Sequence, residues 1–171
     1  MPVQRLNHAV LYVREVERSV RFDRETLGFR PLVQFPGAAF LQAPGSTNDH
    51  DLALFEVGAE AKDSAAGKGA VGLYHLAWEV DTLDELQRIE AELRKSSALV
   101  GASDHHTTKA LYAHDPDGLE FEVCWLVPAA SITEELRSRD PRPLPLDLDA
   151  EIARYGSYTL GGVGVSIPPR P

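Results

Sequence analysis

The 171-residue chain has a single cysteine, few basic residues and no long apolar run. Cys124 alone cannot form an internal disulfide, which fits a reducing compartment. The 17 Lys and Arg residues against 26 Asp and Glu give a formal net charge of −9, which argues against nucleic acid or an anionic membrane as the main partner. No segment approaches the ~20 apolar residues of a transmembrane helix, and the N-terminal residues lack the apolar stretch of a signal peptide. We therefore expect a soluble cytoplasmic protein.

The chain contains an internal repeat. Residues 6–22, LNHAVLYVREVERSVRF, align without a gap on residues 73–89, LYHLAWEVDTLDELQRI, and this alignment matches His8 with His75. Each copy opens with alternating apolar and polar residues, as a half-buried strand does, and then changes to helical spacing. In the second copy this spacing predicts one apolar helix face, formed by Leu83, Leu86, Ile89 and Leu93.

Three short strands are expected after the helix of each copy. They lie at residues 27–35, 38–43 and 51–57 in the first copy and at 98–104, 108–115 and 119–125 in the second. The closing strands share the tripeptide Phe-Glu-Val, and the residues DPDG at 115–118 predict a hairpin turn before the last strand. The predicted fold class is therefore α+β, with two paired βαβββ modules.

The modules are expected to form one domain over residues 1–128. Within it, module one spans 4–57, a small and polar linker spans 58–72, and module two spans 73–127. The remaining residues, 129–171, are expected to form an extension.

The extension is expected to be irregular apart from two helices. A short helix is predicted over 132–139, and a second one is predicted to begin at Asp147 and to end at Gly156. The intervening DPRPLPLD is too rich in proline for a core element, and residues 161–171 are expected to form an irregular tail.

Two histidines and a glutamate are candidate metal ligands. His8 and His75 occupy the same position of equivalent strands, and Glu122 lies on the closing strand of the second copy. A histidine on a strand is more often an ordinary core or surface residue, but the matched register favours a metal site. Two imidazoles and one carboxylate form a face of three ligands, which leaves open positions on iron(II) for a substrate and O₂.

These segments resemble the vicinal oxygen chelate superfamily, which includes glyoxalase I, bleomycin-resistance proteins and extradiol catechol dioxygenases. The resemblance covers about residues 4–127 and rests on LNHAVLYV, LYHLAWEV and YAHDPDGLEFEV. It implies that the two modules form a half-barrel cleft. The chain is most similar to type I extradiol dioxygenases, in which a histidine of each module and the last glutamate hold iron. This implies His8, His75 and Glu122 as ligands of Fe(II), with Mn, Ni or Zn as alternatives.

The same resemblance implies three catalytic residues. His50, in DHDLALF, matches an acid–base histidine of these enzymes, and Tyr112 matches a tyrosine ten residues before the metal-binding glutamate. His105 is a further candidate, although its spacing requires a gap. An imidazole suits proton transfer because its pKa lies near neutrality, and Asp51 is expected to face away from the site and to orient the loop. The alternative is that His50 is a surface residue at the end of a loop.

The implied function is that of an Fe(II)-dependent extradiol dioxygenase, expected to be a homo-oligomer, which cleaves a small aromatic diol with O₂. Four apolar residues are expected to shape the ring pocket, namely Leu11, Phe55, Leu111 and Trp125. One alternative is a glyoxalase-like isomerase or lyase with nickel or zinc, in which Glu56, expected on the same face as His50, is a fourth ligand. Another is a bleomycin-resistance-like binding protein, against which the intact His-His-Glu set argues.

Overall fold

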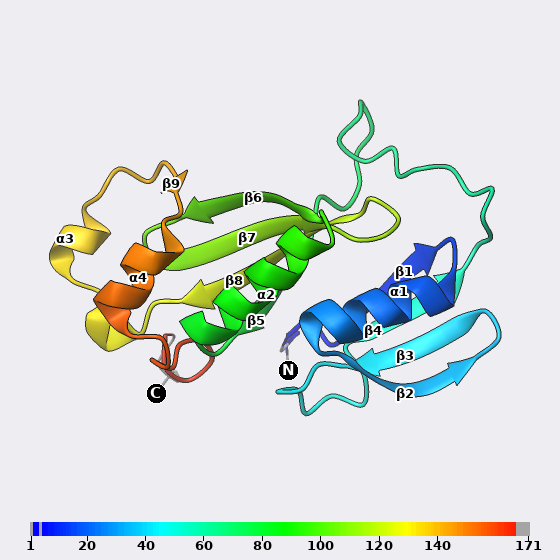
Figure 1. Ribbon diagram of the computed structural model, residues 1–171, viewed down its shortest axis with the longest axis horizontal. Coiled ribbons are helices and arrows are strands. Elements are labelled where there is room, and N and C mark those ends of the chain that lie inside the picture. The colour runs from blue at the N-terminus through cyan, green and yellow to red at the C-terminus, as the bar shows by residue number, and fades with distance from the viewer. Residues whose placement is uncertain (1, 4, 167–171) are drawn as a thin grey trace. The chain divides into compact units, whose positions relative to one another are not determined.

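The computed structural model describes residues 2–3 and 5–166 of the chain (Figure 1). By their contacts these residues fall into two compact units. Unit 1 comprises the described residues up to Ser64 together with the turn Asp115–Gly118, and unit 2 comprises Ala65–His114 and the described residues from Leu119 onward. Each unit contains one β-sheet and at least one helix, so the predicted α+β class is confirmed. The single domain over 1–128 stays a prediction.

Unit 1 is a four-stranded sheet with helical turns on one side. Its elements are β1 (Ala9–Val13), α1 (Val16–Phe22), a π-helical turn (Asp23–Leu27), β2 (Arg30–Phe35), β3 (Ala38–Gln42) and β4 (Leu52–Glu56). The strand order is β1-β4-β3-β2, with β1 parallel to β4 and the other neighbours antiparallel. Val16 and Val20 of α1 are buried, and α1 contacts β3 and β4.

Unit 2 repeats this arrangement. Its repeated elements are β5 (Leu76–Val80), α2 (Leu83–Lys95), β6 (Leu99–Asp104), β7 (Thr108–His114) and β8 (Glu120–Leu126). The strand order β5-β8-β7-β6 corresponds strand for strand to that of unit 1, and β5 is parallel to β8 as β1 is to β4. The predicted βαβββ repeat is therefore confirmed.

The helix α2 covers one face of the unit 2 sheet. The four apolar residues predicted for it are all buried, and Thr82 caps its first turn by accepting a hydrogen bond from the Glu85 amide. Beneath it, Phe121, Val123 and Trp125 of β8 are buried, and the alternate residues of β8 point to the opposite face, called the open face below. Among the described residues, no helix is long and apolar enough to cross a membrane.

The C-terminal extension packs as part of unit 2. It contains a 3-10 turn (Ala129–Ser131), α3 (Glu134–Arg137), β9 (Leu144–Pro145) and α4 (Leu148–Tyr155). The start of α4 is as predicted, since Asp147 accepts a hydrogen bond from the Ala150 amide, and so is its end at Gly156, which has a φ of 89°. The helix predicted over 132–139 is shorter, and the proline-rich segment forms the exposed two-residue strand β9 beside β6. Residues 167–171 of the predicted tail lie outside the described residues.

The predicted turn at 115–118 is confirmed. Gly118 has a φ of 81°, and its amide donates to the Asp115 carbonyl. The Asp117 carboxylate accepts hydrogen bonds from the Arg14 amide at 2.9 Å, from the Arg14 guanidinium at 3.0 Å and from Arg18. This ion-pair cluster, in which the Asp117 side chain is nearly buried, joins the turn to the start of α1 within unit 1.

Candidate functional site

Two of the predicted metal ligands lie together on the open face of unit 2. His75 immediately precedes β5 and Glu122 lies on the neighbouring strand β8, where it pairs in register with Ala77. Nε2 of His75 is 3.2 Å from a carboxylate oxygen of Glu122, and both side chains are largely buried. The other ring nitrogen of His75 is buried without a hydrogen-bond partner. The parallel pairing of β5 with β8 is what brings these two residues together.

Two of the predicted catalytic residues lie on the same face. Tyr112 of β7 pairs in register with Glu122, its ring is 5.8 Å from that of His75, and its hydroxyl is 2.9 Å from Nε2 of His105. Burial and the nearby Glu122 carboxylate raise the pKa of Tyr112 to about 12. The phenol is therefore protonated at neutral pH and can donate a hydrogen bond. Unit 2 thus brings four of the six predicted site residues together: His75, His105, Tyr112 and Glu122.

The two remaining predicted residues meet in unit 1. The rings of His8 and His50 have centroids 4.4 Å apart. Nδ1 of His8 is 2.7 Å from the side-chain oxygen of Asn7, which leaves Nε2 as its free ring nitrogen. Nδ1 of His50 is 3.3 Å from the Asp49 carboxylate, and hydrogen bonding from His50 lowers the pKa of Asp49. Asn7 and Asp49, which sequence reasoning missed, thus hold one nitrogen of each imidazole.

Asp51 orients the loop before β4, as predicted, and His50 precedes it in this loop. The Asp51 carboxylate accepts hydrogen bonds from the Ala43 amide, the Ser46 hydroxyl and the Asn48 side chain. Because these partners lie within the loop and at its edge, Asp51 is directed into the loop while the His50 ring contacts His8 and Phe40. The backbone bends at this point, and the regular strand begins only at Leu52.

An aromatic cluster adjoins the histidine pair of unit 1. The rings of Phe40 and His50 are perpendicular with centroids 5.2 Å apart, and the ring centroids of Phe55 and Phe35 lie 6.0 and 6.3 Å from that of Phe40. Phe55 belongs to the predicted ring pocket, whereas Phe35 and Phe40 were missed. Successive side chains of β2 and β3 point to opposite faces of the sheet, and this alternation could have indicated that Phe35 and Phe40 are pocket residues.

Three of the four pocket predictions are wrong. Leu111 and Trp125 are fully buried on the α2 side of the unit 2 sheet, and Leu11 pairs with the buried Leu54 on β4. The central strands are buried on both faces, so residues at successive positions are apolar. The sequence of such a strand therefore does not reveal which face is open.

Glu56 does not share the face of His50. Its carboxylate accepts a hydrogen bond from the Val16 amide at 3.0 Å, so it caps the first turn of α1. The expectation that Glu56 faces the same way as His50 fails because residues 50 and 51 lie outside the regular part of β4. Among residues 2–3 and 5–166, no group of three His, Cys, Asp or Glu side chains forms a complete metal site.

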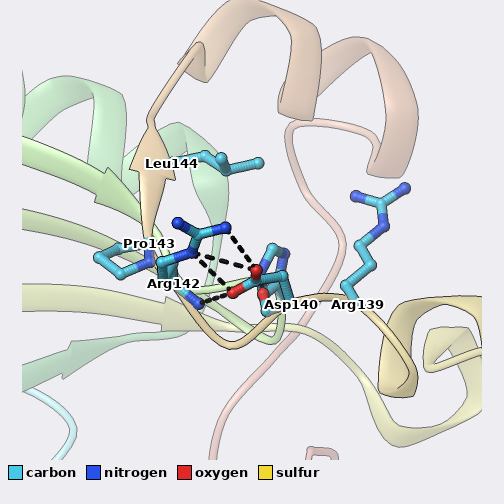
Figure 2. Close-up of a pocket in the computed structure, with 6 residues that line it drawn as sticks. Arg139, Asp140, Arg142, Pro143 and Leu144 are labelled. Atoms are coloured by element: carbon cyan, nitrogen blue, oxygen red, sulfur yellow. Dashed lines mark hydrogen bonds and ion pairs between the residues drawn. The ribbon is translucent and has the colours of Figure 1, made fainter.

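His106, next to the candidate His105, has a structural position. It is 8% exposed, has a φ of 68°, and donates through Nε2 to the Asp140 carbonyl. It borders a hollow of about 470 Å³ formed with Arg139, Asp140, Arg142, Pro143 and Leu144 (Figure 2). There Arg142 hydrogen-bonds the Asp140 carboxylate at 2.7 to 3.1 Å, which neutralises both charges. The hollow includes none of the predicted site residues.

The fold and the site together define a protein of two βαβββ modules that presents histidine, glutamate and tyrosine side chains on the open faces of its sheets. The Glyoxalase/Bleomycin resistance protein/Dioxygenase superfamily model matches residues 5–123, and the chain belongs to this family. The predicted superfamily membership is thereby confirmed. The match ends within β8, so the whole C-terminal extension lies beyond it.

A relative, the catechol-2,3-dioxygenase of Bacillus subtilis (strain 168), is 31% identical over 118 residues, which are 69% of this chain. The matched region spans only 40% of the length of that relative. Among solved structures, a glyoxylase/bleomycin resistance protein/dioxygenase domain from Frankia sp. EAN1pec has a TM-score of 0.60 and 23% identity, with 72% of this chain and 98% of that chain covered. A lactoylglutathione lyase from Agrobacterium tumefaciens has a TM-score of 0.53 and 21% identity, with 72% and 95% covered. The two structures share the fold.

Proposed function

We propose that the protein is an extradiol dioxygenase that cleaves a catechol-like aromatic diol with O₂ and holds Fe(II) through His8, His75 and Glu122. The observation that carries the proposal is the group of His75, Glu122, Tyr112 and His105 on one face of unit 2. The similarity to a protein named catechol-2,3-dioxygenase supports the same chemistry.

The ligand pair of unit 2 fits a metal ion. Two ligands bound about 2.1 Å from one ion at a right angle lie roughly 3 Å apart. Nε2 of His75 and the Glu122 oxygen are 3.2 Å apart, and the second His75 nitrogen faces the Glu120 carboxylate at 3.9 Å, as the second nitrogen of a metal-bound imidazole commonly faces a carboxylate. Bound iron(II) supplies open positions for the diol and O₂ and lowers the pKa of a coordinated hydroxyl.

The protein's own residues supply proton transfer and orientation. His50, held by Asp49, takes the proton of a substrate hydroxyl through its free ring nitrogen and returns it later in the reaction. The protonated Tyr112 phenol donates a hydrogen bond to a substrate oxygen. Phe40 and Phe55 provide edges and faces against which an aromatic ring packs.

The glyoxalase-like alternative requires a fourth protein ligand. Glu56 is the residue for that role, and its carboxylate is engaged with the Val16 amide at the start of α1. This contact favours the set of three ligands, which leaves room for O₂ beside a chelating diol.

Metal content and oxygen uptake test the proposal. The protein is loaded anaerobically with iron, its bound metal is measured, and O₂ consumption is followed across a panel of catechols. We expect stoichiometric iron and O₂ uptake with ring cleavage. Isomerase activity with nickel or zinc and no O₂ uptake supports the four-ligand alternative. A protein that binds no metal but binds small aromatic molecules is a sequestering protein, and the proposal is then wrong.

The role of His50 is tested by His50→Ala. Positioned proton transfer contributes about 10²–10⁴-fold, so kcat is expected to fall by that order while iron content and anaerobic catechol affinity stay near the wild-type values. The matched control is His114→Ala, which removes a half-exposed histidine of β7 and is expected to leave kcat unchanged. Loss of iron in His50→Ala makes His50 a ligand, and wild-type turnover makes it a surface residue.

A further inference from the structure

The C-terminal part of the described chain returns to the sheet of unit 2. The residues Gly161–Ser166, called the end segment, lie beside the start of α2 at the last described part of the chain (Figure 1). The Gly161 amide donates to the Asp81 carbonyl at 2.8 Å, and the Ser166 hydroxyl donates to the Leu126 carbonyl at 2.8 Å. These acceptors lie just after β5 and at the end of β8, so the end segment is fixed to the carboxyl ends of both strands.

Two glycines allow the end segment to approach Glu79 of β5 closely. The Val163 amide donates to a Glu79 carboxylate oxygen at 3.0 Å. A Cβ atom on Gly162 would lie 2.2 Å from the same oxygen, and one on Gly161 would lie 2.2 Å from the Leu126 carbonyl oxygen. Gly162 also has a φ of +86°, which side chains disfavour. The close approach therefore depends on glycine.

Glu79 lies on the face that carries the candidate ligand. It pairs in register with Cys124, which follows Glu122 by two residues on β8 and so points to the same open face. The neighbour of Cys124 on the other side is the small Ala110. Cys124 is only 8% exposed although the neighbouring Glu79 is exposed, and the end segment lies against the Glu79 carboxylate.

We infer that the end segment is a fixed wall of the substrate site, which contacts Glu79, covers Cys124 at that end of the open face and limits how far a ring substituent extends along it. Two residues along a strand span about 7 Å, so Cys124 lies about that far from Glu122 along β8. The inference rests on the proposed function. The family match ends at residue 123, so this wall is a feature of the chain beyond the matched modules.

The cover is tested without any activity assay, because Cys124 is the chain's one cysteine. Its rate of modification by a thiol reagent is measured in the wild type, Gly162→Ala and Gly164→Ala. Gly164 has a φ of +80° and nothing within 4 Å of its added Cβ, so its variant carries a similar backbone penalty without the contact with Glu79. Thiol reactivity depends on pKa and on exposure, and Gly162→Ala leaves the charges around Cys124 unchanged. We therefore expect about a tenfold faster reaction in this variant alone, from the gain in exposure.

A second pair of variants keeps this test decisive if Gly162→Ala fails to fold. Glu79→Ala removes the acceptor of the Val163 amide, whereas Glu79→Gln keeps an acceptor oxygen of the same size. Both variants remove the Glu79 charge, which contributes after burial to the raised pKa of the Cys124 thiol. Their comparison therefore isolates exposure, and Glu79→Ala is expected to react faster than Glu79→Gln. Far-UV circular dichroism and a cooperative thermal transition verify the fold of each variant. Equal modification rates in folded Glu79→Ala and Glu79→Gln overturn the cover.

The wall itself is tested by substrate size. The ratio of kcat/KM for a phenyl-substituted catechol to that for catechol is compared across the same variants. We expect Gly162→Ala and Glu79→Ala to raise this ratio about tenfold, as pocket contacts of this size do, with kcat/KM for catechol itself nearly unchanged. An unchanged ratio with a faster thiol reaction makes the end segment a cover of Cys124 alone and overturns the wall. A wild type that cleaves no catechol refutes the proposed function and the substrate limit with it, while the thiol rates still decide the cover.

Discussion

Asp23, at the junction of α1 and the π-helical turn, makes the stability of the protein depend on pH. The residue is 7% exposed, and burial, with a further contribution from the Asp115 carboxylate, raises its pKa from 3.8 to about 7. The folded state therefore holds a proton on Asp23 at pH values where the unfolded chain has lost it. Stability from this group is fully present below pH 4 and is lost as the pH rises toward 7.

The size of the effect follows from the pKa. One pKa unit corresponds to 1.36 kcal/mol, so a rise from 3.8 to about 7 costs about 4 kcal/mol of unfolding free energy at pH 8. Asp23→Asn removes the charge at every pH. We therefore expect the variant to be more stable than the wild type by up to about 4 kcal/mol at pH 8 and to differ little from it at pH 4.

The measurement is urea unfolding followed by far-UV circular dichroism at several pH values between 4 and 8. Other titrating groups occur in both proteins, so the difference in unfolding free energy between variant and wild type isolates Asp23. Asp49→Asn is the control, because that carboxylate is exposed and its pKa is lowered. A difference for Asp23→Asn that stays constant from pH 4 to pH 8 refutes the reasoning.

Three further outcomes are expected. Lys109→Met removes the buried amine 2.5 Å from Asp104 and leaves a buried carboxylate without its cationic partner, so we expect it to lower the free energy of unfolding by about 3–5 kcal/mol. The exposed Lys95→Met is expected to change the free energy of unfolding by less than about 0.5 kcal/mol in the same urea assay. His75→Ala is expected to lose stoichiometric iron, measured by elemental analysis, while it keeps a cooperative thermal transition; full iron content contradicts its role as a ligand. Glu122→Gln is expected to weaken iron binding by at least about tenfold and Glu56→Gln to leave it unchanged, and equal losses in a metal titration favour the four-ligand alternative.

Local patterns in the sequence predicted much of the fold. The repeat between residues 6–22 and 73–89 corresponds to two sheets of the same strand order. The buried residues of α2 and the limits of α4, from Asp147 to Gly156, also agree with the prediction. These features depend on periodicity, caps and turns, which act within a few residues of the chain.

The candidate site was predicted in part for the same reason. Matched positions in the repeat pointed to His75, and the alternation along β8 put Glu122 on the open face beside it. The contact of His105 with Tyr112 did not follow from spacing, because the turn between β6 and β7 determines where a loop histidine points. Glu56 was assigned to the wrong face since the bend at residues 50 and 51 breaks the strand period.

The sequence by itself determined which segments become strands and helices, and which side chains share a face within a regular stretch of one strand. It could not determine what lies above each face, because that depends on residues far apart in the chain. Lys109 is fully buried between Asp104 and the α4 residue Glu151, and Val163 of the end segment contacts Glu79, which lies 84 residues earlier in the chain. Burial of an amine is unfavourable unless carboxylates surround it, and these two carboxylates come from distant parts of the chain. Likewise, the close approach that requires the two glycines is evident only once the neighbouring strand is known. Only the tertiary structure brings those partners together.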